Sequence, residues 1–293
     1  MGKRILLLGA TGMLGSAVYN ELKNSHSLVL AVRNQDKVKL LEKTFGGTNS
    51  HEVVEFDATK MYEDMLNKKG YPGDYFSAFL ARVGDIDYVI NAAGVTIPFS
   101  LKDPAMTLFV NGALPHILSR TFGSKLIHIT TDCAYDGKEG FPYDERSPKT
   151  PVDLYGHSKM IGEPEGSLTI RTSIIGRELD GFTGLLEWFL QQNGKEITGF
   201  SNHFWNGLTT KQMAKVCRQI IENPTVFPKS GIHHVFSNPV SKLHMLNRFK
   251  EKFGITCTIK DDPNPRLNRT LATVSDLNSK LAIPSFDEMV KEM

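Results

Sequence analysis

The fold is decided close to the N-terminus, where residues 4–15 read Arg-Ile-Leu-Leu-Leu-Gly-Ala-Thr-Gly-Met-Leu-Gly. The apolar run over 4–9 predicts a buried strand, and an amphipathic helix over 13–23 follows the glycines at once. Glycines between a strand and a helix let backbone amides approach a pyrophosphate at the positive helix end. This context predicts a dinucleotide-binding turn of GxxGxxG spacing, with a helix-capping turn as the alternative. The residues expected to contact the cofactor here are Gly9, Thr11, Gly12, Met13, Leu14 and Gly15.

Downstream of this turn, short apolar runs alternate with longer amphipathic segments, which is typical of βα units around a parallel sheet. The predicted strands cover residues 4–9, 28–32, 53–56, 87–91, 125–130 and 168–172. The predicted helices cover residues 13–23, 36–44, 75–83, 104–122, 154–163, 185–192, 211–222, 241–253 and 286–293. We therefore expect an α/β fold, with a Rossmann-type doubly wound parallel sheet over residues 1–172. A smaller, partly interleaved C-terminal α/β substrate lobe over 173–293 should exchange segments with it.

Composition narrows the classes of partner. The 293 residues include 34 Lys and Arg against 32 Asp and Glu, a net charge of +2, so no basic surface for nucleic acid is indicated. No apolar stretch approaches the roughly 20 residues that a bilayer requires, and we expect no membrane partner. The three cysteines are scattered, which favours a reducing, cytoplasmic setting. His233 and His234 are adjacent and should diverge on a strand, so we expect no metal site.

The end of the second predicted strand bears on the choice of cofactor. It reads Ala-Val-Arg-Asn over 31–34, where an acidic residue is usual in NAD-preferring proteins. The cation of Arg33 suits a 2′-phosphate and favours NADPH as the cofactor. Asp36 follows three residues later, so NADH is also possible. The alternative for Arg33 is a solvated surface charge. Asp57, after the third strand, is expected either at the adenine or as a helix N-cap.

A second constellation lies in the middle of the chain. Tyr155 and Lys159 are four positions apart, which places them on one helix face about 6 Å apart along the axis. An ammonium beside a phenol stabilises phenolate and should lower the phenol pKa towards the working range. Thr131, at the end of the fifth strand, offers a hydroxyl at the edge where ligands of doubly wound sheets bind. We expect these three residues to be catalytic.

Three motifs together resemble an extended short-chain dehydrogenase/reductase: the glycine turn, Asn-Ala-Ala-Gly over 91–94, and Tyr155 to Lys159. The segments 129–137, 142–145 and 155–163 are similar to dTDP-4-dehydrorhamnose reductase and related sugar-nucleotide 4-ketoreductases. The resemblance implies NADPH-dependent reduction of the C4 ketone of a nucleotide-linked 4-keto-6-deoxy sugar, in deoxysugar and polysaccharide precursor biosynthesis. By the family's pattern, Tyr155 is the general acid, Lys159 holds the nicotinamide ribose, and Thr131 orients the ketone.

The resemblance also assigns further contacts. The cofactor contacts that it implies are Ala92, Ala93, Gly94 and Asn111, in addition to Tyr155 and Lys159. The substrate contacts that it implies are Thr96, Thr131, Tyr135, Asn206 and Arg269. Two of these have alternatives, because Asn111 could be a helix-interior polar residue facing solvent and Arg269 could form a surface ion pair.

The substrate-facing segments depart from the family's pattern. Residues 132–135 lack the usual Tyr-Val-Phe, and residues 202–207 and 265–271 are unlike the reductase loops, so the sugar stays undefined. A sugar-nucleotide epimerase or dehydratase, or a bifunctional epimerase-reductase, is the first alternative. A non-catalytic NADP-binding regulatory subunit is the second. A homodimer is left open.

Overall fold

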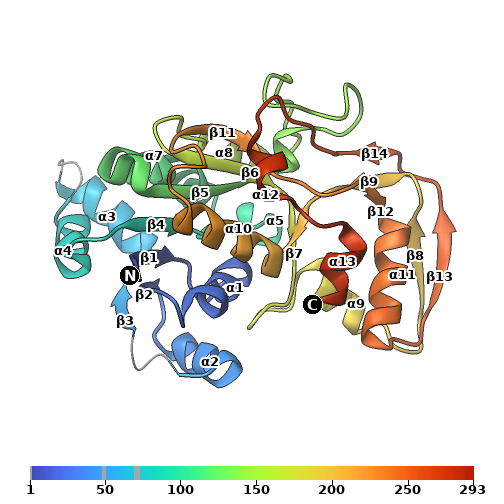
Figure 1. Cartoon of the computed structure of the whole chain (residues 1–293), viewed down its shortest axis with the longest axis horizontal. Helices are drawn as coiled ribbons and strands as arrows, with labels where there is room; N and C mark the ends of the chain where they lie inside the picture. The colour runs from blue at the N-terminus through green and yellow to red at the C-terminus, as the bar shows by residue number, and fades with distance from the viewer. Residues whose placement is uncertain (1, 48–50, 69–72) are drawn as a thin grey trace.

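A seven-stranded, wholly parallel sheet forms the centre of the protein (Figure 1). The structure is a computed structural model and describes residues 2–47, 51–68 and 73–293. The strands in this sheet are β1 (Arg4–Leu8), β2 (Ser27–Val32), β3 (Glu52–Glu55), β4 (Tyr88–Asn91), β5 (Leu126–Thr131), β6 (Leu168–Thr172) and β11 (Gly231–His234). Their order is β11-β6-β5-β4-β1-β2-β3. The chain adds β2 and β3 on one side of β1 and then crosses to add β4, β5 and β6 on the other side, so the order of strands reverses between β1 and β4. The predicted doubly wound α/β fold is confirmed.

Both faces of the sheet are covered by helices. Alternate residues of β1 enter opposite cores, since Ile5 and Leu7 pack on one face and Leu6 and Leu8 on the other. The helices on the first face are α1 (Met13–Leu22), α2 (Asp36–Phe45) and α10 (Thr210–Glu222). Those on the second face are α3 (Ala58–Lys68), α4 (Asp74–Val83) and α7 (Leu114–Phe122). Across the described residues, no helix is both long and apolar enough to cross a bilayer.

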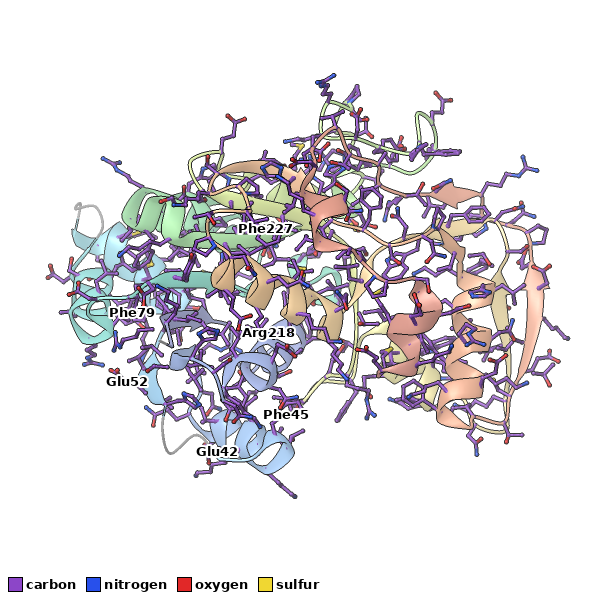
Figure 2. The ribbon with its side chains drawn as sticks, in the orientation of Figure 1. Glu42, Phe45, Glu52, Phe79, Arg218 and Phe227 are labelled. Atoms are coloured by element: carbon purple, nitrogen blue, oxygen red, sulfur yellow. The ribbon has the colours of Figure 1, made fainter. Side chains whose placement is uncertain are left out.

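Two labelled side chains in Figure 2 mark these opposite faces. Phe79 of α4 packs in the core of the second face. Arg218 of α10 lies at the first face, where its Nε contacts Glu21 Oε1 of α1 at 2.7 Å. Thus a helix from the second half of the chain packs directly on the first helix of the sheet domain.

The smaller lobe lies at the carboxyl end of the sheet, on the right in Figure 1. One of its small sheets pairs β8 (Glu196–Phe200) with β13 (Thr258–Asp262), and another orders β12 (Val240–Ser241), β9 (His203–Trp205) and β14 (Leu267–Asn268). A third pairs β7 (Ile174–Ile175) with β10 (Leu208–Thr209). The helices of the lobe are α9 (Leu185–Leu190), α11 (Lys242–Phe253) and α13 (Phe286–Lys291). Both α10 and β11 come after residue 172, yet they belong to the large sheet and its helical layer. A boundary at residue 172 therefore does not separate the sheet domain from the smaller lobe.

Several parts of the secondary structure differ from the predictions. The predicted strands did not include β11 of the large sheet or the strands of the smaller lobe, and two helical regions also differ. The helix predicted over 104–122 is divided into α6 (Pro104–Leu108), a π-helical turn (Phe109–Ala113) and α7. Pro115 has no N–H to donate to the carbonyl of Asn111, so the regular ladder cannot continue there. The sequence reading also missed α3, whose apolar stripe is thin, with Met61 its fully buried member.

Candidate active site

The glycine turn forms a cradle at the N-terminus of α1. Gly9 has φ +74°, and a Cβ on it would lie 2.9 Å from the Ala93 backbone. A Cβ on Gly15 would lie 2.0 Å from the carbonyl oxygen of Gly9, so the helix can approach the strand only with glycine here. The N-cap residue Gly12 supplies no side-chain cap to the helix amides. The turn therefore offers free backbone donors and the positive helix end to an anion.

The three predicted catalytic residues meet at the carboxyl end of β5. Thr131 ends this strand, and Tyr155 and Lys159 lie on α8 (Leu154–Ile161). Asp153 begins α8 by accepting a hydrogen bond from the Gly156 amide at 2.7 Å. The Thr131 side chain lies near enough to the Tyr155 hydroxyl to favour its phenolate form, while Thr131 Oγ1 itself donates to Asp132 Oδ1 at 3.2 Å and accepts from the Cys133 amide at 3.2 Å. Two segments 24 positions apart in the sequence are thereby joined in one polar group.

The electrostatics of Tyr155 correct one expectation. Burial raises the pKa of the Tyr155 hydroxyl well above its ordinary value of 10, and Cys133 adds to the rise, whereas Thr131 opposes it. The predicted lowering of this pKa by Lys159 is therefore wrong for the protein alone, because desolvation of the phenolate is the largest effect and Lys159 is not among the groups that shift the pKa. Tyr155 is a neutral phenol at pH 7 and can donate a proton.

Lys159 is a buried ammonium. Its side chain is 6% exposed, and its Nζ donates to the Ile129 carbonyl at 3.1 Å. Burial lowers the pKa of Lys159 to about 8, and Glu163 partly offsets this effect. The neighbouring His128 is fully buried, and the pKa of its imidazole is held well below the ordinary value by burial and then by Lys159. His128 therefore adds no positive charge beside Lys159 at neutral pH.

Asn111 lies in the π-helical turn and is fully buried, which rules out the solvent-facing alternative. Its Oδ1 accepts from the Val95 amide at 2.8 Å, and its Nδ2 donates to the Val95 carbonyl at 2.9 Å. Nδ2 also donates to Ser158 Oγ at 3.1 Å. A Cβ on Gly94 would lie 3.3 Å from Asn111 Oδ1 and 3.8 Å from Lys159 Nζ. Asn111 therefore holds the segment that starts at Gly94 against α8.

At the other end of the crevice, Arg33 and Asp57 follow β2 and β3. Arg33 is exposed and, among the residues that the structure describes, has no hydrogen bond or ion pair. Asp57 precedes α3, and its Oδ1 accepts from the Thr59 amide at 2.9 Å, which is the capping role left open by the sequence. Arg33 is available to a ligand, whereas Asp57 already caps a helix.

Two predicted substrate contacts need correction. Tyr135 is fully buried, stacks on Tyr143 at 4.2 Å, and donates its hydroxyl hydrogen to the Asp144 carbonyl. Its hydroxyl also accepts from Arg171 Nη1 at 2.7 Å, so no part of it is free for substrate. Asn206 pairs both amide atoms with the Leu271 backbone, at 2.8 and 2.9 Å. Both side chains serve packing, since burial and hydrogen bonding leave them no free polar atom.

Of the remaining predicted substrate contacts, Thr131 has been described above, and Thr96 and Arg269 are free to meet a ligand. Thr96 is exposed at the N-cap of α5 (Ile97–Ser100) without a side-chain capping bond. Arg269 extends over the segment after β5, with Nη1 3.6 Å from Cys133 Sγ. Within the described chain Arg269 forms no ion pair, so the surface-pair alternative is not observed.

Sequence reasoning missed a charged cluster beside Thr131, which we call the lobe cluster: Asp132, His203, Trp205, Lys242 and Arg269. Lys242 Nζ lies 5.7 Å from the centre of the Trp205 ring. Burial lowers the pKa of Lys242 and raises that of Asp132, while their mutual attraction opposes both shifts. A cavity of about 110 Å³ is lined by Lys242, Trp205, Ser173 and Met13 of the glycine turn. The lobe cluster therefore opens beside the glycine turn.

His203 contributes no charge to this cluster at neutral pH. Burial, followed by Lys242 and Arg269, lowers the pKa of its imidazole to about 4. With Asp132 ionised, Lys242 and Arg269 leave the cluster with a net positive charge, which suits an anionic ligand. Among the described residues no group of three or more metal-ligating side chains gathers.

The site fits a nicotinamide dinucleotide. The glycine cradle suits a pyrophosphate, and the Thr131, Tyr155 and Lys159 hydrogen-bonding groups lie beyond the same strand ends, at the reversal of strand order. Lys159 and the segment at Gly94 would hold the nicotinamide ribose, and Arg33 would meet the adenosine end. A bound dihydronicotinamide would supply a hydride.

Relatives include proteins of different kinds. "Methionine adenosyltransferase 2 subunit beta" of Danio rerio is 26% identical over 274 residues, which are 88% of this chain and 73% of that protein. "dTDP-4-dehydrorhamnose reductase" of Burkholderia thailandensis is 37% identical over 81 residues, 26% of this chain and 27% of that protein. The match to the Danio rerio protein covers most of this chain, whereas the match to the Burkholderia thailandensis protein has a higher identity over a shorter segment.

Solved structures share the fold. A dTDP-4-dehydrorhamnose reductase from Bacillus anthracis, in complex with NADP, has a TM-score of 0.68 at 15% identity, covering 100% of this chain and 98% of that one. A UDP-N-acetylglucosamine 4-epimerase from Methanobrevibacter ruminantium has a TM-score of 0.71 at 15% identity, covering 99% and 96%. The sequence profile described as the RmlD substrate binding domain matches residues 3–265. The chain belongs to the RmlD substrate-binding-domain family, which confirms the resemblance inferred from its motifs.

Proposed function

We propose that the protein is an NADPH-dependent oxidoreductase that reduces the C4 ketone of a nucleotide-linked 4-keto-6-deoxy sugar. The observation that carries this proposal is the placement of Thr131 at the end of β5 beside Tyr155 and Lys159 on α8, with Lys159 buried one helical turn from the neutral Tyr155 hydroxyl. These groups lie beyond the strand ends that also carry the glycine turn. A proton donor and a dinucleotide cradle therefore share one crevice.

The chemistry requires two transfers to one carbonyl group. A bound dihydronicotinamide would supply a hydride to C4, and the Tyr155 hydroxyl would give its proton to the carbonyl oxygen, so that the ketone would become an alcohol. Thr131 orients the carbonyl oxygen towards Tyr155. The high pKa of Tyr155 keeps the proton in place until the oxygen gains negative charge. Lys159, charged below about pH 8, stabilises the phenolate that remains.

Arg33 supports NADPH as the cofactor. Its exposed guanidinium follows β2, where the adenosine ribose of a dinucleotide lies, and the described residues do not neutralise it. The Bacillus anthracis neighbour holds NADP in its complex. NADH is the alternative, and the ratio of dissociation constants for the two nucleotides decides between them.

The test is a screen of dTDP-, UDP-, GDP- and CDP-linked 4-keto-6-deoxy sugars, with NADPH oxidation followed at 340 nm. We expect turnover with at least one of these substrates and none with the nucleotide alone. A protein that binds NADPH yet reduces no ketone would contradict the proposal. Tightly retained NAD with no net consumption of NADPH would instead favour an epimerase or dehydratase.

A second candidate, a non-catalytic regulatory subunit, rests on a specific observation. The Danio rerio relative, named as a subunit of a methionine adenosyltransferase, matches 88% of this chain. Against it stand the neutral Tyr155 hydroxyl, the Thr131 side chain near it and the buried Lys159. Co-purification with an adenosyltransferase, together with silence in the ketone screen, would favour the regulatory function.

A further inference from the structure

The segment that follows β7 reaches back across the crevice to the adenosine end. This segment, residues 176–184, which we call the strap, connects β7 of the smaller lobe to α9. In Figure 1 the chain between β7 and α9 turns back towards α1 and α2. Glu178 holds the strap as a closed turn, because its carboxylate accepts from the amides of Thr183 and Gly184 at 2.9 and 2.6 Å.

One ion pair joins the strap to the sheet domain. Asp180 Oδ2 lies 2.9 Å from Nζ of Lys37, the second residue of α2. The side chains are 52% and 43% exposed, and pairs so exposed contribute little to stability. The position of this ion pair bears on cofactor binding, because α2 begins four residues after β2, and the ribose of a dinucleotide lies at the end of β2. A carboxylate from the second lobe is thus paired with Lys37, four positions after the exposed Arg33.

We infer that Lys37 is a second cation for the 2′-phosphate of NADPH and that Asp180, by pairing with Lys37, sets the selectivity between NADPH and NADH. The inference rests on the proposed cofactor and adds residues that the sequence did not single out. A 2′-phosphate carries nearly two negative charges at pH 7, and Arg33 alone offers one positive charge. Lys37 supplies the second when it exchanges Asp180 for the phosphate.

Asp180 has the opposite effect on the same ligand. Its carboxylate is ionised at neutral pH, because the hydrogen bond from Lys37 lowers its pKa. It therefore competes with a 2′-phosphate for Lys37 and repels it, while a ribose hydroxyl feels no such repulsion. Asp36 does not take this role, since its carboxylate pairs with Lys39 at 3.0 Å. Removing Lys37 and removing Asp180 should change the selectivity in opposite directions.

The test measures dissociation constants of NADPH and NADH, which differ only in the 2′-phosphate, for the full-length protein without substrate. The variants are Lys37→Met, Asp180→Asn and a control, Lys43→Met, which removes the same charge from an exposed residue in the last turn of α2. We expect Lys37→Met to weaken NADPH about tenfold and NADH less than twofold. Asp180→Asn should tighten NADPH about threefold, and both differences should shrink at 1 M salt. The control should change neither constant more than twofold.

Other outcomes separate the failure of this inference from that of the proposed function. Suppose that the wild type binds NADPH. If Lys37→Met then weakens the binding of NADPH and NADH equally, or changes neither dissociation constant, the inference is overturned and the proposed function is not. Weaker binding of both nucleotides to Asp180→Asn would show that the pair only fastens the strap, and would also overturn it. A wild-type protein that binds neither nucleotide would overturn the proposed cofactor and this inference together.

Discussion

The two sides of the crevice are built in different ways. On the sheet side, Thr131, Tyr155 and Lys159 come from the end of one strand and one face of the adjacent helix. On the lobe side, Asp132 follows β5, whereas Lys242 and Arg269 come from segments more than a hundred positions away. The sheet side has its charge buried and fixed, with Lys159 6% exposed. The lobe side gathers two cations around one carboxylate.

This difference teaches how chemistry and specificity are divided. A general acid needs a set distance to one oxygen, which a helix face and a strand end supply through local geometry. A lobe that recognises a particular sugar nucleotide needs charges in a pattern that only tertiary packing creates. We therefore expect substitutions on the sheet side to reduce the rate, and substitutions on the lobe side to reduce substrate binding.

The largest effect is expected from Tyr155→Phe. Loss of the proton donor should lower kcat roughly a thousandfold and leave NADPH affinity within twofold, because the hydroxyl acts chiefly in the transition state. Steady-state kinetics and nucleotide titration measure the two quantities. Tyr143→Phe is the matched control, since it removes another buried tyrosine hydroxyl, one that bonds Asp136 and Glu139. An equal loss of NADPH affinity in Tyr155→Phe would count against its role as the acid.

Lys159→Met should stabilise the protein while it removes activity. Burial lowers the pKa of Lys159 from 10.5 to about 8, so the folded protein holds this proton less tightly than the unfolded chain does. At pH 7 the buried charge therefore destabilises the wild type, and we expect the variant's free energy of unfolding to be about 2 kcal/mol higher. As the pH rises from 8 towards 10.5, the wild type gains stability and the advantage shrinks. Urea unfolding at pH 7 and pH 9.5 measures it, and a variant less stable at pH 7 would contradict the account.

A smaller effect, on binding, is expected from Lys242→Met. Removing one of two cations from the lobe cluster should raise KM for the sugar nucleotide about tenfold and change kcat less than threefold. Lys260→Met is the control, because it removes the same charge from β13, where Lys260 pairs with Glu196 at 2.6 Å. If Lys242→Met lowered kcat with KM unchanged, the proposed division between the two sides would be wrong.

The same contrast explains what could be predicted from the sequence. The glycine turn and the Tyr155–Lys159 spacing are local patterns with one geometry, so the fold and the proposed catalytic pair could both be predicted from them. Asn111 could be placed at the site but not in a π-helical turn, which depends on the missing N–H of Pro115.

Tertiary pairing accounts for the misassigned residues. The family resemblance implied a substrate contact at Tyr135, yet its hydroxyl hydrogen-bonds Arg171 and Asp144. Lys242 carries no local signal, since its neighbours in the crevice, Trp205 and Asp132, lie far away in the sequence. Only folding brings these side chains together.

Hydride transfer from cofactor to sugar can be followed with a deuterium label. NADPH that carries deuterium at C4 of the nicotinamide ring, at the position that is transferred, is incubated with the enzyme and a 4-keto-6-deoxy sugar nucleotide that it turns over. The sugar product is examined by mass spectrometry and NMR. The account predicts one deuterium at C4 of the sugar, and loss of the transfer in Tyr155→Phe. Deuterium that stays on the nucleotide while the wild type binds both ligands would contradict it.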